Sequence, residues 1–276
     1  MAVQRVLWVE RGTGVVTRRE DDDIPALLAD PSGWLWLDVP EPDEATGTLL
    51  RDAFGAHPAA VTDVLERNHV PRLHVYGQTL LLILQRPLPG ENGHVHYLEL
   101  DQLIGPNYLV TTHGPRNPAV PLEVMLEETA ELAERMLTGR RVPSGPWDAS
   151  HRIVSSLTIA QERQVNALAR DVGGLEQRVM AQRSDAHPEA LLEDLFRTRH
   201  TLLTLRTMAG QAAEIYGRAI RLLGEEAGVR ESLRDSKDAY DRLSRIAGSQ
   251  LEYLSGVTEY YRARTDTKMT IAAERL

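Results

Sequence analysis

The chain has 276 residues, of which 42% are hydrophobic, 26% charged and 5% aromatic, a composition typical of a soluble protein of one or two domains. Its 40 acidic and 31 basic side chains give a formal net charge of -9, which opposes binding to a phosphate backbone and argues against nucleic acid as a partner. The chain contains no cysteine, so disulfides, thiolate zinc sites and thiol nucleophiles are excluded.

Neither a membrane span nor a secretory signal is predicted. The longest apolar runs, such as residues 79–84, are far shorter than the roughly 20 residues that cross a bilayer. The N-terminal apolar stretch is interrupted by Arg5, Glu10 and Arg11 and has no small-residue cleavage pattern. We therefore expect the chain in the cytoplasm.

Residues 1–118 predict a mixed α/β domain. Short β-rich runs bounded by Gly, Pro, Asp or Asn predict strands at 3–10, 34–39, 79–85, 95–103 and 108–112. Apolar residues at helical spacing predict helices at 43–54 and 58–66, with Asp43 and the His57-Pro58 pair as helix starts.

The remainder of the chain predicts helices. Residues 119–226 carry helical patterns at about 120–138, 147–182 and 188–226, which we expect to pack on the sheet and to form a helical hairpin. Residues 227–276 form the third segment, a long stalk helix over about 229–275. Residues 265–276 contain no Gly, Pro or Asn stop signal, so we expect this helix to be cut rather than capped at Leu276.

The stalk helix carries a heptad pattern. Apolar residues recur at every seventh position: Leu233, Tyr240, Ala247, Leu254 and Tyr261. Leu243 and Val257 occupy intervening d positions, whereas Ser236 and Gln250 occupy the others. The pattern predicts a seam for neighbouring helices, either in a self-associating stalk or within the chain's own domain.

Catalytic and nucleotide-binding motifs are absent from the sequence. No Gly-rich turn is followed by Lys and Ser or Thr, and no His has a nucleophile partner at a suggestive spacing. His94 and His96 would share one strand face, but no third metal ligand is near them in sequence.

Acidic residues are the stronger candidates for a metal site, because Mg²⁺ prefers carboxylate oxygens. Asp63 lies on a predicted helix, and Asp235, Asp238 and Asp241 recur at i, i+3 and i+6 on the stalk helix. The alternative interpretation is a solvated face paired with neighbouring Arg and Lys residues.

The order of several short motifs resembles the cytoplasmic part of the CorA family of divalent-cation transporters. These motifs are distributed along nearly all of the chain. They are WLDVP at 36–40, FGAHP at 54–58 with DVL at 63–65, PR at 71–72, LLTLR at 202–206, RD at 234–235, EYY at 259–261 and KMT at 268–270. The family's Gly-Met-Asn signature and transmembrane helices would lie beyond Leu276.

The resemblance implies an α/β/α sandwich followed by a long stalk helix, assembled as a homopentamer on the cytoplasmic side of the cell membrane. It implies that Asp63 and Asp235, with Asp238 beside them, bind Mg²⁺ between subunits and so keep the pore closed. Thr62 stands where the family often has Glu, which removes one carboxylate from the proposed site.

Alternative interpretations remain open at this stage. A zinc- or cobalt-transporting member of the family would give weight to His94, His96 and His113. A free-standing helical scaffold would end naturally at Leu276. A metal-dependent hydrolase would need residues that only folding brings together. We predict no enzymatic activity.

Overall fold

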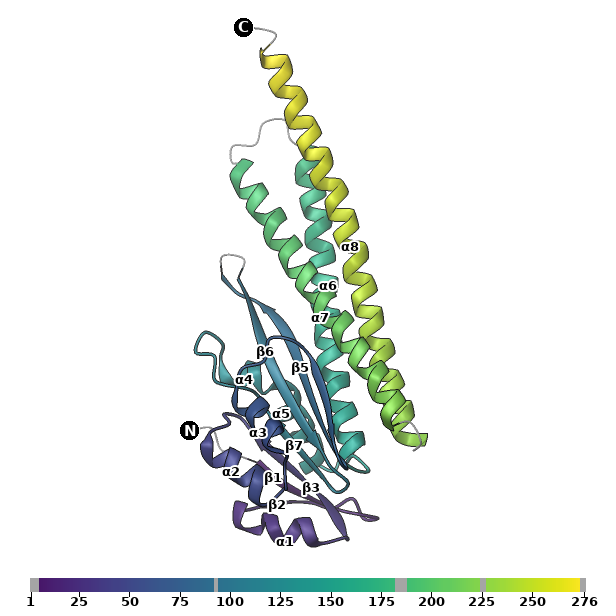
Figure 1. Ribbon diagram of the computed structural model, residues 1–276. Coiled ribbons are helices and arrows are strands. Elements are labelled where there is room, and N and C mark those ends of the chain that lie inside the picture. Colours follow the sequence, from purple (N-terminus) through teal and green to yellow (C-terminus); the bar gives the residue numbers. More distant parts are fainter. Residues whose placement is uncertain (1–4, 92–93, 182–187, 224–226, 274–276) are drawn as a thin grey trace.

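The computed structural model describes residues 5–91, 94–181, 188–223 and 227–273 and contains a seven-stranded sheet and three long helices (Figure 1). The strands are β1 (Arg5–Glu10), β2 (Val16–Arg19), β3 (Gly33–Val39), β4 (Arg72–Tyr76), β5 (Thr79–Pro89), β6 (Val95–Ile104) and β7 (Tyr108–Thr112). The helices are α1 (Ile24–Ala29), α2 (Glu44–Asp52), α3 (Pro58–Leu65), α4 (Leu122–Met125), α5 (Glu127–Leu137), α6 (Pro146–Ala181), α7 (Pro188–Leu223) and α8 (Ala227–Ala273), and residues 21–23 form a short 3₁₀ turn.

The sheet has the strand order β2-β1-β3-β7-β6-β5-β4. Strands β3 and β7 run parallel at its centre, with Trp36 opposite Leu109, and the other neighbouring strands are antiparallel. Because β3 and β7 are parallel, their carboxyl ends meet at one edge of the sheet. This arrangement brings Asp38 and His113 together, although 75 positions separate them.

Both faces of the sheet are covered by helices, and the strand residues alternate between two cores. In β3, Trp34 and Trp36 belong to the core on the side of α6 and α7, whereas Leu35 and Leu37 belong to the core on the side of α1, α2 and α3. Burial of β3 on both faces explains why this strand is apolar apart from Asp38. The predicted α/β/α sandwich is confirmed.

Local capping defines α2 and α3, two of the three helices that cover the second core. The Asp43 carboxylate accepts a hydrogen bond from the Thr46 amide at 2.9 Å at the start of α2. The His57 Nδ1 atom accepts one from the Ala59 amide at 3.2 Å at the start of α3, where Pro58 is the first helical residue. Both predicted helix starts are confirmed.

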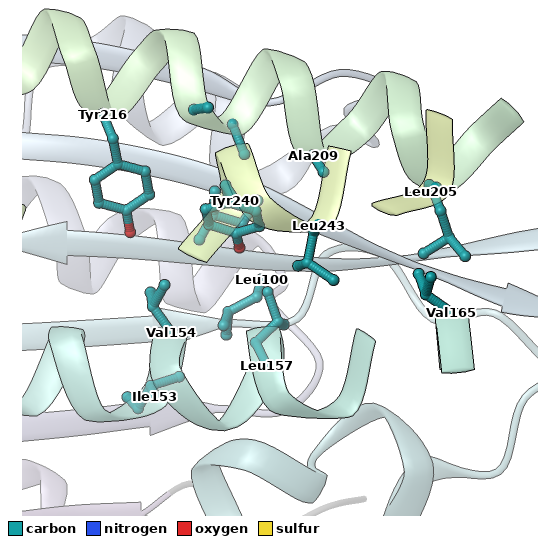
Figure 2. Packing of buried hydrophobic residues seen from close by; sticks show 14 of the residues in the cluster. Leu100, Ile153, Val154, Leu157, Val165, Leu205, Ala209, Tyr216, Tyr240 and Leu243 are labelled. Atoms are coloured by element: carbon teal, nitrogen blue, oxygen red, sulfur yellow. The ribbon is translucent and has the colours of Figure 1, made fainter. Parts of the chain in front are cut away.

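Helices α6, α7 and α8 form an elongated bundle that extends well beyond the sheet (Figure 1). The heptad seam of α8 lies inside this bundle: Leu233, Tyr240, Leu243, Ala247, Leu254, Val257 and Tyr261 are all buried. Figure 2 shows Tyr240 and Leu243 among residues of α6 and α7, including Leu157 and Ala209. Between the two expected roles of the seam, the structure therefore shows packing against the chain's own helices.

Three short elements and one break were not expected from the sequence. Strands β2 and β4 lie at the two edges of the sheet and are largely exposed, so they lack a clear apolar pattern. Helix α1 has only six residues. The predicted helix 120–138 breaks at Leu126, because Met125 packs with Leu98 in a small separate core whereas Met136 packs into the main one.

The stalk and hairpin boundaries agree closely with the expected helices. The structure has 146–181, 188–223 and 227–273 where we expected 147–182, 188–226 and 229–275. Four predicted elements have one end outside the described residues: the strand 3–10 and the helices 147–182, 188–226 and 229–275, at residues 3–4, 182, 224–226 and 274–275 respectively. Division of the chain into units 1–118, 119–226 and 227–276 stays a prediction.

Candidate metal site

Asp63 lies near the end of α3 and already has a cationic partner. Its Oδ1 atom lies 3.0 Å from Arg72 Nη1 on β4, and its side chain is 19% exposed. The neighbouring Thr62 is exposed, and its hydroxyl donates a hydrogen bond to the Pro58 carbonyl. A cation that bound Asp63 would therefore compete with Arg72, and Thr62 would add no carboxylate.

Asn68 anchors the end of α3 to the sheet. Its side-chain Nδ2 atom donates hydrogen bonds to the Asp63 backbone carbonyl at 2.7 Å and to Glu99 Oε1 at 2.7 Å. Its backbone amide donates a hydrogen bond to Glu99 Oε2 at 2.9 Å. Asn68 is buried, and Gln85 donates a hydrogen bond to its carbonyl. These bonds fix the backbone beneath Asp63 relative to β6.

A second carboxyl group, that of Asp101, lies beside Glu99 on the same face of β6 and is buried. Thr112 Oγ1 donates a hydrogen bond to Asp101 Oδ2 at 3.0 Å. Burial raises the pKa of Asp101 well above its usual range, and the charge of Glu99 raises it further. Burial also raises the pKa of Glu99, although the bonds from Asn68 oppose that rise. Protonated Asp101 can then donate a hydrogen bond to Glu99.

The Asp101→Asn variant should be more stable than the wild type at neutral and higher pH. A carboxyl whose pKa is raised by folding contributes full stability below its unfolded pKa of about 3.8, and that contribution falls as pH rises toward the folded pKa. Asparagine resembles the protonated acid, so we expect a gain of about 1–3 kcal/mol at pH 8 and no gain at pH 3.5. Urea unfolding at the two pH values measures the difference, and equal gains at both would contradict it.

Asp38 and His113 form a further buried polar network at the carboxyl ends of β3 and β7. Asp38 Oδ1 lies 3.0 Å from His113 Nε2 and accepts a hydrogen bond from Thr111 at 2.7 Å, while Asp38 Oδ2 lies 3.4 Å from Arg5 Nη1. His113 is 2% exposed. His113 is therefore a buried partner of Asp38. It was expected to matter in a zinc- or cobalt-transporting family member.

The pKa of Asp38 reflects opposing effects. Burial by itself would raise it, but the hydrogen bonds from His113 and Thr111 and the charge of Arg5 together hold the pKa of Asp38 below its usual range. Asp38 is thus a charged group held inside the fold by hydrogen bonds from Thr111 and His113 and by the charge of Arg5. Its side chain points away from solvent, so it stabilises the sheet rather than offering a surface ligand.

The stalk carboxylates lie in a different part of the molecule. Asp235 and Asp238 are exposed on α8, and within the described residues no hydrogen bond or ion pair involves the Asp235 side chain. Asp241, one turn further along, pairs with Lys237. Asp235 is therefore free to bind a cation, whereas the charge of Asp238 interacts with Lys237 and Asp241 pairs with Lys237 directly.

Asp63 and Asp235 do not meet within one copy of the chain. Helix α3 covers one face of the sheet, and α6 and α7 lie on the other face (Figure 1). Helix α8 packs against α6 and α7. Within the described ranges, no group of three or more His, Asp or Glu side chains is placed to hold a metal ion. A shared ion at Asp63 and Asp235 would therefore need two copies of the chain.

His94 and His96 lie together at the tip of the β5–β6 hairpin, as their spacing predicted. Their ring centroids are 4.7 Å apart, and His96 Nδ1 lies 3.4 Å from the Asn117 side-chain nitrogen. Two imidazoles without a third ligand make an incomplete zinc site.

Comparison with known proteins identifies the family. The sequence model of the family described as CorA-like Mg²⁺ transporter protein matches residues 31–276. The chain belongs to this family. As a CorA-like protein it is assigned to ion transport rather than to enzymatic catalysis. In the described parts of the chain, no helix has the length and apolar character that a membrane span requires.

A curated relative and a solved structure are similar to this chain. A curated relative, the putative metal ion transporter YfjQ of Bacillus subtilis, is 23% identical over 239 residues, which are 86% of this chain and 70% of that protein. The structure of the full-length CmaX protein matches with a TM-score of 0.78 at 20% identity and covers 98% of this chain and 79% of that one.

Two solved domains match nearly from end to end. The soluble domain of CorA from Methanocaldococcus jannaschii has a TM-score of 0.72 at 16% identity, with 94% of this chain and 96% of that chain covered. The ZntB cytoplasmic domain from Vibrio parahaemolyticus has a TM-score of 0.72 at 13% identity, with 95% and 98% covered. The chain therefore has the architecture of the cytoplasmic domain of a CorA-like transporter.

Proposed function

We propose that this chain is the cytoplasmic regulatory domain of a magnesium transporter and that it senses divalent cations between its copies. The observation that carries the proposal is the family match over residues 31–276, which includes both α3 and α8. In this proposal the full-length protein is a homopentamer anchored in the cell membrane by segments that follow α8, and the domain lies on the cytoplasmic side.

The proposed sensor consists of Asp63 of one copy and Asp235, assisted by Asp238, of the next. Support comes from their positions, since α3 and α8 cover opposite sides of a single copy and exposed Asp235 has no protein partner among the described residues. Two carboxylates suit Mg²⁺, which retains several of its waters and needs few protein ligands.

Ion binding would regulate the pore by altering how copies associate. Each copy carries a net charge of -9, so copies repel one another, and a divalent ion between two carboxylates offsets part of that repulsion. A ligand that binds only the associated state shifts the equilibrium toward it as the ligand concentration rises. Abundant Mg²⁺ would thus favour the closed assembly, and scarce Mg²⁺ would release it.

The helical bundle offers surfaces on which copies could associate. The heptad seam is already buried within the chain, so any contact between copies along α8 would use the two flanks of this helix. One flank, beside α6, has an apolar groove with Tyr253 and Tyr260, rimmed by Glu176 and Glu252. The other, beside α7, exposes Phe196, which is 60% exposed and lies near Arg199 and Arg262. Glu259 lines this second groove as well, so its two arginines leave a smaller excess of positive charge. Carboxylates on one flank and arginines on the other support a head-to-tail contact, which forms a ring when its rotation closes.

The sensor proposal predicts that Mg²⁺ binding and Mg²⁺-dependent association both depend on Asp63 and Asp235. Mg²⁺ is titrated into the full chain by calorimetry, with light scattering as a measure of association. The double variant Asp63→Asn, Asp235→Asn should weaken Mg²⁺ binding by about tenfold or more, because each substitution removes one anionic ligand.

The matched control is Asp241→Asn. It removes the same charge from α8, but Asp241 pairs with Lys237 and is not part of the proposed site. The control should bind Mg²⁺ as the wild type does. If the double variant and the control both bind like the wild type, Asp63 and Asp235 are not the sensor.

A second candidate is the cytoplasmic domain of a zinc- or cobalt-transporting family member. It is favoured by the adjacent imidazoles of His94 and His96 and by the likeness in fold to the ZntB domain. The same titration with Zn²⁺ separates the two candidates. Tight Zn²⁺ binding that the His94→Ala, His96→Ala variant loses, together with weak Mg²⁺ binding, would favour zinc over magnesium.

A further inference from the structure

A polar pocket lies between the end of α5 and the first turns of α6, outside the sites described above. It has a volume of about 360 Å³ and is lined by Arg135 of α5, Arg141 of the connecting loop and Arg152, Ser156 and Ile159 of α6. Ligand pockets in proteins begin at about 300 Å³, so this one is large enough for a small organic molecule.

The pocket is positively charged in an otherwise acidic protein. Three guanidinium groups line it against a single carboxylate, Asp148. That carboxylate receives two hydrogen bonds from Arg152, from Nε at 2.8 Å and from Nη2 at 3.1 Å, which orient the guanidinium. Arg135 pairs with Glu131 through one terminal nitrogen, so its remaining donors are available. Guanidinium groups bind phosphate oxygens through paired hydrogen bonds.

Arg141 has an unusual backbone. Its φ of 58° lies in the left-handed region, and it is the one non-glycine residue with positive φ among those that the structure describes. Helix α5 ends at Leu137 and is followed by Gly139, whose φ is 69° and whose amide donates a hydrogen bond to the Met136 carbonyl. Arg141 is thus a second left-handed residue two positions after Gly139. This backbone conformation strains an arginine, whereas glycine would adopt it without strain.

A strained arginine that lines a basic pocket indicates a binding role, because strain of this kind concentrates at ligand sites. We propose that this pocket binds a small phosphate-bearing molecule, with Arg141, Arg135 and Arg152 as its anion ligands. The hydroxyl of Ser156 adds a neutral donor, and Ile159, which is 48% exposed, offers an apolar contact to the remainder of the molecule. This inference does not depend on cation sensing by Asp63 and Asp235.

The test is calorimetric titration of inorganic pyrophosphate into the full chain in the absence of divalent cations. The key variant is Arg141→Gly, which removes the guanidinium while relieving the backbone. The matched control is Arg140→Gly, which removes the same charge from the adjacent, exposed residue that does not line the pocket.

The wild type and the control should bind pyrophosphate with similar affinity, whereas Arg141→Gly should bind about tenfold more weakly or worse. The melting temperature should rise in Arg141→Gly and not in the control, which shows that the variant is folded and that the backbone was strained. Equal weakening in both variants would reveal unspecific attraction of an anion, and absence of saturable binding by the wild type would also overturn the proposal.

Discussion

Replacement of Asp38 by alanine should lower the free energy of unfolding by about 3–5 kcal/mol at neutral pH, the usual cost of removing one partner from a buried ion pair. Asp38 is 1% exposed and contacts His113, Thr111 and Arg5. Without the carboxylate, a buried imidazole and a buried hydroxyl lose their acceptor, and the nearby guanidinium loses its counter-charge. Urea unfolding followed by circular dichroism measures the loss.

The pH dependence of Asp38 has a definite sign. Because the pKa of Asp38 is lowered by folding, its contribution to stability is present above the unfolded pKa of about 3.8 and is lost as pH falls through the folded pKa. The difference between the wild type and Asp38→Ala should therefore shrink in acid. Asp38→Asn, which retains an acceptor for Thr111, should cost less than Asp38→Ala. A loss below 1 kcal/mol in Asp38→Ala would show that the network does not stabilise the sheet.

Replacement of Tyr240 by alanine should also cost about 3–5 kcal/mol, as truncation of a large buried aromatic side chain usually does. Tyr240 is 1% exposed and lies at the centre of the bundle, with its ring 5.8 Å from that of Tyr216 (Figure 2). The truncation leaves a cavity where α8 meets α6 and α7, so the loss should appear as a lower midpoint of urea unfolding.

Tyr260→Ala is the matched control for Tyr240→Ala. Tyr260 belongs to the same helix, but its side chain is 45% exposed, so its removal should change stability by no more than about 0.5 kcal/mol. Equal costs for the two substitutions would mean that the heptad seam of α8 is not held within the chain. The comparison thus tests the packing of the stalk helix directly.

Most of the fold could be predicted because its signals are local. The nearly continuous apolar runs in β3 and β5 follow from burial on both faces, and the capping residues Asp43 and His57 mark helix starts within one turn. The long helices have strong 3.6-residue periods. Edge strands β2 and β4 escaped prediction, since an exposed strand needs no apolar pattern.

The candidate site was only partly predictable. Asp63 and Asp235 could be named from short motifs, and exposure of Asp235 agrees with a ligand role. The pairing of Asp63 with Arg72 was not predicted, because Arg72 belongs to edge strand β4, which has no clear apolar pattern. The buried pair Glu99 and Asp101 could have been predicted from one feature of the sequence. These two acids occupy alternate positions among the apolar residues of strand β6 and so share one face of it.

The amino-acid sequence by itself determined the order and kind of most elements, the helix starts and the heptad seam, because each depends on neighbours within a few positions along the chain. Only the tertiary structure decided what those elements meet. Strand order brought Asp38 and His113 together, and packing of the segment after α3 against β6 joined Asn68 to Glu99 across 31 positions. Helix packing placed Asp63 and Asp235 on opposite sides of the sheet and buried the seam of α8 within its own bundle. Such contacts depend on strand order and helix packing, for which no short stretch of sequence carries a signal.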